Sequence, residues 1–567
     1  RRARTDERAT VRRSAVGAWC EMLNLARQER KTRPHPPYEE FGLSALDISV
    51  LCQLCNDASV ATRKAAADAL TQLVRDSSEE CTAQSHSLEI AWAYTVLPLV
   101  SDAEASCATK AVEFFSLLIV EPIVALGQEF TTDAPSDDED GSRNARRLVA
   151  WRILSTLSDG SKEAGGSRNA SGSLTIALQK LLIQAGKDGA ESLAKNLLQA
   201  VYHVGGTSIG LDRRSSSSLD ESIMSHDGDE PGENLFDLHT TAKRTGAWCL
   251  LAALCSCLSN ESNSSTTNTP SSSMLTSVSL DQAVRACHID SSFLTLSLKK
   301  LRALINSPDT PSDAKCGLAV TSRDCLRVLA KMARFLPCDD AKACFSDLQN
   351  ELESFTVSID LISTAVHALI ALTNRMCDVD GNSERNDVFG EVQSWVNGLF
   401  DRCKNAIESC FTSLAQRGAI SKEDEKLLAH VLHLIGELSI IGFTPQEESR
   451  LNSSTKKQGD EITLPTDRES VRGLLIRPSS RLVHLVKLML PNAMPMPSAD
   501  AEDDGWAPTP STLRAHAFIT IGKFCLRDES LAKESLNMFA RELHQVSNAD
   551  PAVQVSAVRS VIVFCSH

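Results

Sequence analysis

The chain has 567 residues, of which 42% are hydrophobic, 5% are aromatic and 23% are charged, and its formal net charge is −15. The hydrophobic content suffices for a packed core, whereas the acidity argues against a dedicated nucleic-acid-binding domain, which normally carries a basic excess. A local basic patch is not excluded. The most apolar run, 111–127, is interrupted by Glu113, Glu121 and Pro122, so we expect no membrane span.

The 18 cysteines are scattered over apolar segments, and we expect no signal peptide. This distribution is typical of reduced, buried thiols, and we expect a soluble protein of a reducing compartment. The chain has no initiator Met and stops at His567 inside an apolar helical pattern. We therefore expect it to be a fragment of a longer protein.

Five regions follow one another along the chain. Residues 1–130 predict dense helix and open with the most basic stretch, which we interpret as a solvated first helix. Helices alternate with acidic and Ser-rich loops over 131–311, and return with few interruptions over 312–443. A loop-rich segment, 444–512, contains a helix near 479–490, and 513–567 is helical again. The main loops are 131–144, 158–172, 205–234, 259–279, 444–468 and 491–510. The first four and the acidic stretch 500–504 are predicted to be disordered, because such polar segments cannot offset their ordering entropy.

Several predicted helices share one spacing of residue types. Counted from Leu513 as position zero, position 4 is small and position 8 is apolar and bulky, while position 1 is polar or basic and position 7 is small in every frame except that at Cys107, which has Ala108 and Phe114 there. Small residues let two helices approach closely, while the bulky residue fills the space between them. An Asp precedes several of these frames. The frames begin at Val11, Thr62, Cys107, Ala242, Leu513 and Val553, and the aspartates are Asp6, Asp57, Asp102 and Asp550.

The frames recur at the period of a known repeat type. Those at Val11 and Thr62 start 51 residues apart, those at Thr62 and Cys107 start 45 apart, and those at Leu513 and Val553 start 40 apart. HEAT and armadillo units span about 40–47 residues. Two helices joined by a short turn cannot bury their apolar faces alone, so such units stack. The sequence predicts an all-α fold, a HEAT/armadillo-type helical solenoid with long disordered loops.

The final repeats are the most regular. Apolar residues three and four apart line one side of a helix from Leu513 to Cys525, with Ile521 in the core, and a second helix follows Ser530, a candidate N-cap. A third is predicted to begin at Asp550.

The stretch from Leu513 to Leu543 resembles the signature segment of the D-type HEAT-repeat subunit of condensin, and specifically the condensin II type. The resemblance rests on LRAHAFITIGKFCL at 513–526, followed by Leu531-Ala532-Lys533 and Arg541-Glu542-Leu543. Shorter stretches at 6–12, 92–114, 325–337 and 348–355 agree with it. The resemblance covers about half of the chain and is poor between about 130 and 310.

This resemblance implies a non-catalytic condensin II subunit. Its expected partners are the kleisin subunit, the two SMC ATPase subunits, the second HEAT subunit and, without sequence specificity, chromatin or DNA. Its expected roles are mitotic chromosome condensation and segregation, with localisation in the nucleus and on mitotic chromosomes. The net acidity leaves an alternative open, a HEAT-repeat nuclear transport receptor or phosphatase scaffold whose acidic face receives a basic partner.

No motif points to catalysis, a cofactor or a small-molecule substrate. The chain lacks a GxxxxGK loop, a GxSxG elbow and a kinase signature. The CxxC pair Cys52 and Cys55 has no second pair at zinc-site spacing, and His430, His433 and Glu437 lack the HExxH pattern, so we interpret both groups as packing residues. We expect neither an enzyme nor a metal site.

Two sets of residues are candidates for function. Arg12, Arg63, Lys243 and Arg514 occupy position 1 of their frames, where they can contact a partner or phosphate, or form a structural ladder with neighbouring aspartates, the alternative that we favour. The second set consists of residues that precede a proline in a predicted loop: Thr269, Ser307, Thr310, Thr444 and Thr509. In a mitotic chromosome protein they would be candidates for phosphorylation, although turn chemistry explains the same dipeptides.

Overall fold

A computed structural model describes residues 6–32, 45–77, 83–129, 141–159, 170–207, 238–259, 279–287, 292–379, 381–417, 420–441, 478–490, 510–526 and 528–544. Within these ranges the chain forms helices and turns and no strand, so the predicted all-α class is confirmed. The chain divides into two compact units, Arg1–Met332 and Ala333–His567, which we call the N-terminal and C-terminal units.

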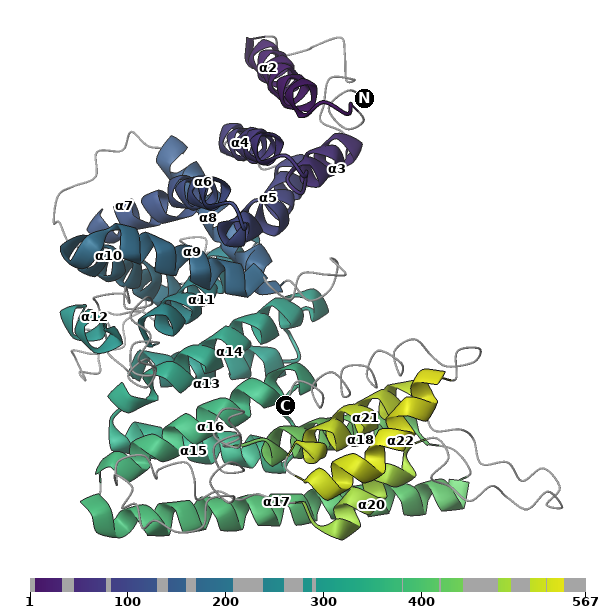
Figure 1. The fold of residues 1–567 in the computed structure, drawn as a ribbon. Helices are drawn as coiled ribbons and strands as arrows, with labels where there is room; N and C mark the ends of the chain where they lie inside the picture. Colours follow the sequence, from purple (N-terminus) through teal and green to yellow (C-terminus); the bar gives the residue numbers. More distant parts are fainter. Residues whose placement is uncertain are drawn as a thin grey trace, which may run out of the picture. The chain divides into compact units, whose positions relative to one another are not determined.

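The N-terminal unit is a series of packed helices (Figure 1). Sequence neighbours pair, and more distant helices lie side by side: α8 packs against α11, α11 against α14, and α7 against α10. The short segment η1 is a 3₁₀ helix and η2 is a π-helix. The elements are α2 (Ala9–Thr32), α3 (Ala45–Leu54), α4 (Val60–Asp76), α5 (Ala83–Thr95), η1 (Leu97–Ser101), α6 (Ala105–Phe115), η2 (Ser116–Val120), α7 (Glu121–Glu129), α8 (Gly141–Asp159), α9 (Ala170–Gln184), α10 (Gly186–Thr207), α11 (Leu238–Ser259), α12 (Leu280–Ala286), α13 (Ser292–Asn306) and α14 (Ser312–Met332).

The C-terminal unit is built in the same way. Helix α16 packs against α15, α17 and α18, while α21 packs against α18 and α22. The segment near 479–490 contains α20. The elements are η5 (Ala333–Phe335), α15 (Cys338–Glu353), α16 (Ile359–Val379), α17 (Gly381–Arg417), α18 (Lys422–Ser439), α20 (Ser480–Leu488), α21 (Ser511–Cys525) and α22 (Glu529–His544).

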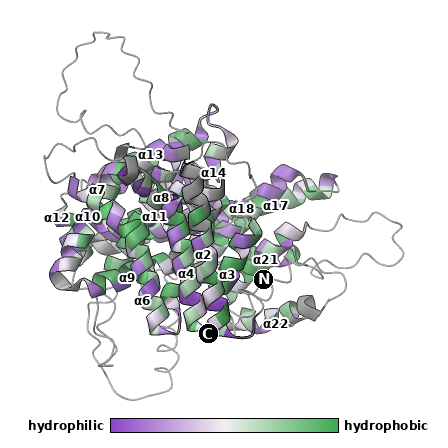
Figure 2. Ribbon diagram, turned by 90° about the horizontal axis from the view of Figure 1, so that it is seen from above, coloured by the Kyte–Doolittle hydropathy of each residue, from purple (hydrophilic) through white to green (hydrophobic). Residues whose placement is uncertain are grey.

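The residue frame found in the sequence marks the buried side of its helices. Figure 2 shows hydrophobic and hydrophilic residues mixed along single helices, as expected when one side of each faces a core. Residues at positions 4, 7 and 8 are buried in α4, α6 and α21, and positions 7 and 8 are buried in α11. These residues are Ala66, Ala69, Leu70, Ala111, Phe114, Phe115, Cys249, Leu250, Ala517, Thr520 and Ile521.

The first frame differs from the others. On α2, Ala18 is exposed and Trp19 is only half-buried, whereas Val16 and Cys20 are buried. Among the described residues α2 packs mainly against α4, so only one side of it is covered. The frame at Val553 lies outside the described residues.

Gly246, at position 4 on α11, permits a close approach between α11 and α8. A Cβ atom placed there would lie 2.5 Å from the backbone oxygen of Trp151 and 3.2 Å from Cβ of Leu154 on α8. Neither helix backbone can yield cheaply, because both are packed on other helices. The small residue at position 4 is therefore a steric requirement here.

Gly246→Ala is expected to destabilise the N-terminal unit by about 1–3 kcal/mol, the usual cost of overpacking a well-filled core. The matched control is Gly17→Ala on α2, where an added Cβ meets no atom within 4 Å and the higher helix propensity of Ala is expected to be neutral or stabilising. Hydrogen exchange of peptides from α8 and α11 would measure the effect. Equal protection in the two variants would contradict the packing argument.

The predicted disordered loops fall mostly outside the described residues, so their disorder stays a prediction. The sequence-based boundaries differ where helices extend into the predicted loops: α8 runs to Asp159 and α10 to Thr207, and two helices begin earlier than expected. The loop expected over 131–144 ends earlier, because α8 already begins at Gly141, and α9 begins at Ala170, inside the loop expected over 158–172. Both helices are stabilised by packing of the apolar residues that follow their polar first turns. The polar residues of the first turn alone therefore do not show where the helix begins.

The run α6, η2 and α7, from Ala105 to Glu129, is the one described helix long and apolar enough to cross a membrane by length and composition. Half of its apolar window is buried within the protein, where Ile119 and Ile123 are fully covered. It packs against α8, α9 and α10. These contacts identify it as a core helix of the N-terminal unit.

Helix α22 departs from the sequence-based expectation at its start. Ser530 was expected to be the N-cap, but the carboxylate of Asp528 accepts the backbone N–H groups of Ser530 and Leu531 at 3.0 and 3.1 Å. The cap is Asp528, two residues earlier, where the carboxylate also faces the positive end of the helix dipole.

Candidate functional site

The first two arginines of the predicted ladder form it. Arg12 on α2 donates from Nε and from a terminal nitrogen to the two carboxylate oxygens of Asp57, each at 2.8 Å, and its other terminal nitrogen bonds the backbone oxygens of Asp6 and Glu7. The hydrogen bond from Arg12 lowers the pKa of the Asp57 carboxyl, whereas partial burial acts to raise it. The guanidinium thus ties one repeat to the turn of the next.

Arg63 repeats this arrangement one unit later. It donates to both oxygens of Asp102 at 2.8 and 2.9 Å, and to the backbone oxygens of Asp57 and Ala58. Burial acts to raise the pKa of Asp102, but the Glu104 backbone N–H and Arg63 outweigh it and the pKa is lowered. Since their donors are engaged within the repeat stack, Arg12 and Arg63 serve as structural links, and their contact with a partner stays a prediction.

The other two frame cations do not continue the ladder among the described residues. Lys243 on α11 and Arg514 on α21 are half-buried and form no ion pair there. The backbone N–H of Arg514 donates to the Pro510 oxygen, while its Nε is buried without a hydrogen-bond partner in the described part of the chain. A role for either residue in partner or phosphate contact stays a prediction.

Of the five Ser/Thr-Pro candidates, only Ser307 and Thr310 lie within the described residues. Thr310 is 6% exposed and its hydroxyl donates to the Leu304 backbone oxygen at 2.6 Å. Ser307 is half-buried and its hydroxyl accepts from the Asp309 backbone N–H. Phosphorylation of Thr310 would require the turn between α13 and α14 to open, whereas Thr269, Thr444 and Thr509 lie outside the described ranges.

The cysteine pair lies where packing explains it. Cys55 is fully buried and unbridged, and burial raises the pKa of its thiol to about 12. Burial also raises the pKa of Cys52. A thiol with a raised pKa is a poor metal ligand and a poor nucleophile, because both roles require the thiolate. No group of three or more His, Cys, Asp or Glu side chains suited to a metal ion occurs in the part of the chain that is described.

The histidines of α18 belong to a charged cluster that also includes α21. Lys523 on α21 donates to Glu437 at 2.6 Å, and His433 Nε2 lies 3.7 Å from the same carboxylate oxygen. The ring of His516 lies 6.3 Å from that of His433. Burial, together with Lys523, lowers the pKa of His433 to about 4 despite the opposing charges of Glu437 and of Asp360. The arrangement holds two helices together through a neutral histidine and an ion pair.

The C-terminal unit is expected to lose stability as the pH falls from about 6.5 to about 4. Burial lowers the pKa of His430 to about 4 as well, so both histidines take up protons more readily in the unfolded chain. Each of the two histidines is expected to lower the free energy of unfolding by about 2 kcal/mol when the pH falls from 7 to 5. Hydrogen exchange of α18 and α21 at the two pH values would measure this. His433→Gln should weaken the pH dependence. The control His484→Gln, at an exposed position on α20, should leave it intact. Identical pH profiles for the two variants would contradict the assignment of the effect to His433.

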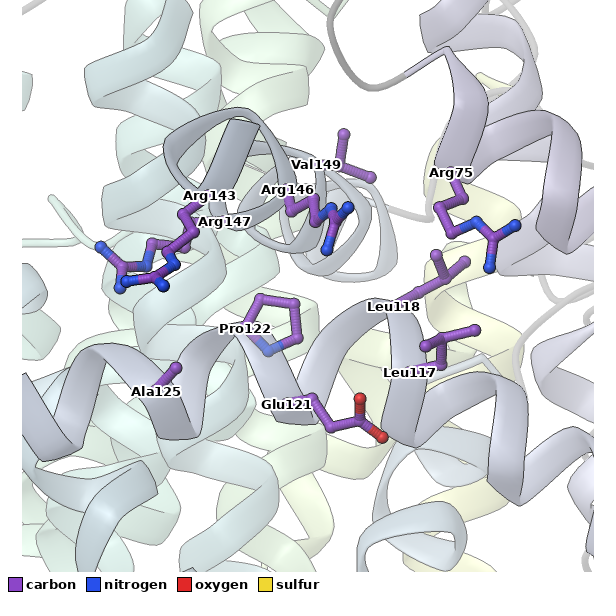
Figure 3. A pocket seen from close by; sticks show the side chains of 10 residues that line it. All are labelled: Arg75, Leu117, Leu118, Glu121, Pro122, Ala125, Arg143, Arg146, Arg147 and Val149. Atoms are coloured by element: carbon purple, nitrogen blue, oxygen red, sulfur yellow. The ribbon is translucent and has the colours of Figure 1, made fainter. Parts of the chain in front are cut away.

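A second basic group was not predicted from the sequence. Four arginines line a cavity of about 220 Å³ in the N-terminal unit, which we call the arginine pocket. Figure 3 shows Arg146 directed from α8 toward Pro122, and Arg75 approaching from α4 beside Leu117 and Leu118. The complete lining is Arg75, Leu117, Leu118, Glu121, Pro122, Ala125, Arg143, Arg146, Arg147 and Val149.

Four elements line this pocket: α4, η2, α7 and α8. On α8, Arg143, Arg146 and Arg147 follow an i, i+3, i+4 spacing, which places them on one face of the helix. Below them, Pro122 lacks the N–H that an α-helix needs, and the chain widens into the π-helix η2, in which the Glu121 N–H reaches the Ser116 oxygen. The i, i+3, i+4 spacing of these three arginines predicts a basic face on a helix. It was missed because the sequence-based loop extended to Asn144 and therefore included Arg143.

The charges of the pocket are unequally compensated. Arg147 pairs with Glu129, and Arg75 lies 3.7 Å from Asp76. Glu121, the one acidic residue of the lining, accepts a hydrogen bond from Ser116 at 3.2 Å. Arg146 is exposed and forms no ion pair with any described residue. The pocket thus offers arginine donors above an apolar floor, within a chain whose overall charge is negative.

Comparison with known proteins bears most directly on the C-terminal unit. Residues 479–543 match the model of the family described as condensin-2 complex subunit D3-like HEAT repeats. Condensin-2 complex subunit D3-L of Xenopus laevis is 24% identical over 542 residues, which cover 95% of this chain and 27% of the relative. The chain therefore spans about a quarter of the length of that relative.

Solved structures with stacked helices are similar at low identity. The C-terminal fragment of the Chaetomium thermophilum cohesin loader SCC2 is 13% identical, covering 100% of this chain and 31% of that chain with a TM-score of 0.49. Kap121p, in its complex with Nup53p, is 12% identical, covering 99% of this chain and 44% of that chain with a TM-score of 0.30.

The family match covers α20, α21 and most of α22, the same region that carries the resemblance seen in the sequence. The HEAT type predicted from the repeat frame is thereby confirmed. Residues 479–543 match the HEAT repeats of the condensin-2 complex subunit D3-like family, and the resemblance of the chain to the D-type HEAT-repeat subunit of condensin II is confirmed.

Proposed function

We propose that the chain is part of a non-catalytic HEAT-repeat subunit of condensin II. In this role it binds the kleisin subunit and chromatin, and it acts in mitotic chromosome condensation and segregation. The observation that carries the proposal is the match of 479–543 to the D3-like HEAT family, supported by similarity to the Xenopus laevis subunit over 95% of the chain. By the same reasoning, the chain works in the nucleus and on mitotic chromosomes.

The physical properties of the chain suit a scaffold. The described thiol of Cys55 and the histidines of α18 pack between helices, where burial raises the pKa of Cys55 and lowers those of His430 and His433. Stacked helices offer long continuous surfaces for an extended partner segment, which is how a kleisin chain would be held. The SMC ATPase subunits and the second HEAT subunit would associate through the complex, and the ATPase activity would reside in the SMC subunits.

Depletion of the protein in dividing cells tests this proposal. We expect wider, poorly resolved mitotic chromosomes and lagging chromatids, which re-expression of the depletion-resistant protein should reverse. A nuclear import reporter serves as the control, because a transport receptor would affect it. Normal chromosomes together with defective import would overturn the proposal in favour of the transport class.

A further inference from the structure

We propose that the arginine pocket binds an acidic peptide segment. One apolar side chain of the peptide inserts into the pocket, and the acidic residues on either side of it contact the arginines. This inference goes beyond the proposed function, since it assigns a binding site to the N-terminal unit whether the segment belongs to a condensin subunit or to another protein. It rests on three features of the pocket: its apolar floor, its excess of arginine and its size.

The floor is apolar and partly open to solvent. Leu117 is 38% exposed although it lies in the most apolar helical run of the chain, and it adjoins Leu118 and Pro122 in the lining. The π-helix η2 and the following proline fix this geometry, because they shift the register of the helix where Leu117 emerges. An exposed leucine beside a concave apolar surface gains free energy when a partner's apolar side chain covers it.

The rim is basic. Four arginines and one glutamate line the cavity, an excess of three positive charges on a chain with a net charge of −15. Guanidinium groups bind carboxylates and phosphates through paired hydrogen bonds, and clusters of them recognise acidic motifs. Arg146, which has no ion-pair partner among the described residues, is the donor placed best for this, and Figure 3 shows it above the floor.

The size and the floor favour a peptide over DNA. A cavity of about 220 Å³ accommodates one large side chain but no part of a duplex. The DNA backbone offers phosphates to arginines but no apolar group for Leu117 and Pro122, so bound DNA would leave the floor uncovered. An acidic peptide with one apolar residue satisfies both halves of the site.

The test uses the full chain and a short fluorescein-labelled peptide in which one phenylalanine is flanked by aspartates. Fluorescence anisotropy should report saturable binding that weakens with added salt, as expected for charge pairing. Replacing the peptide's phenylalanine with serine should weaken binding. Arg146→Glu should weaken it at least about tenfold, the scale of one charged hydrogen-bonded pair. Arg13→Glu, the same charge change at an exposed site on α2, is the control and should have little effect.

Two further variants test the floor without touching the charges. Ala125→Trp should fill the cavity and block binding, and Leu117→Ser should weaken it with the salt dependence unchanged. Both positions are solvent-accessible in part, so these substitutions spare the core. Helix content by circular dichroism confirms that each variant folds.

The sequence between α7 and α8 holds an acidic run, 137–140, that could compete with the peptide, so the titration is repeated with this run changed to Asn and Gln. Unchanged or tighter binding in that variant supports the site. The proposal is overturned by absence of binding to both forms, by equal effects of Arg146→Glu and Arg13→Glu, or by indifference to the peptide's phenylalanine. It is also overturned if a short DNA duplex binds instead and loses affinity with Arg146→Glu.

Discussion

Replacing Ile521 with aspartate should destabilise the C-terminal unit by about 3–5 kcal/mol, because it buries a charge that has no partner. Ile521 is fully buried on α21, the helix that packs against both α18 and α22. The same core includes a contact between α21 and α22, in which the ring centroids of Phe518 and Phe539 lie 5.8 Å apart. The aspartate would have to be protonated or drawn to the surface, and either outcome would disturb this packing.

The matched control is Ile519→Asp, two residues earlier on the same helix but half-buried, where the loss should be much smaller. Hydrogen exchange on the full chain would report it, since loss of protection should concentrate in α18, α21 and α22. Unchanged protection after Ile521→Asp would mean that this face of α21 is not core, and the repeat frame would lose its best example.

The second large effect is expected at the buried ion pair of the N-terminal unit. Glu89 on α5 and Arg152 on α8 are 1% and 8% exposed, and Arg152 Nε lies 3.0 Å from both oxygens of Glu89. Arg152→Met should cost about 3–5 kcal/mol, because it leaves the Glu89 carboxylate buried without its counter-charge. Exchange of α5 and α8 amides would measure the loss.

A double variant separates loss of the pair from loss of packing. Glu89→Leu combined with Arg152→Met removes both charges and should recover much of the stability, since a well-packed apolar pair often equals a buried ion pair. Lys110→Met, which breaks the exposed pair with Glu113, should change stability by less than about 1 kcal/mol. If the double variant were as unstable as Arg152→Met, the uncompensated charge would not be the cause.

Local patterns in the sequence predicted the features that depend on one helix and its next neighbour. The small residues at positions 4 and 7 of the frame are buried in α4, the small residue at position 4 is buried in α6, and Gly246 does admit a close approach of α8. The ladder followed from the same frame, since Arg12 and Arg63 each reach the aspartate that precedes the next helix. Position 1 and the preceding aspartate recur at the repeat length, so their pairing is readable without a structure.

Features that join distant residues were not predictable in this way. Glu89 and Arg152 are 63 positions apart, and Lys523 meets Glu437 across 86 positions. The arginine pocket requires α4, α7 and α8 to converge and a π-helix that no periodicity reveals. At Ser530 the error was local instead, because both Asp528 and Ser530 are good capping residues and only the backbone decides between them.

Affinity capture of the tagged chain from mitotic cell extract, in about 0.3 M salt to screen weak surface ion pairing, tests the central proposal most directly. The expected result is co-purification of a kleisin subunit with two SMC ATPases and a second HEAT subunit, identified by mass spectrometry. Recovery of a small GTPase with basic cargo, or of a phosphatase catalytic subunit, with no kleisin and no SMC protein, would contradict the condensin assignment while leaving the helical-repeat fold intact.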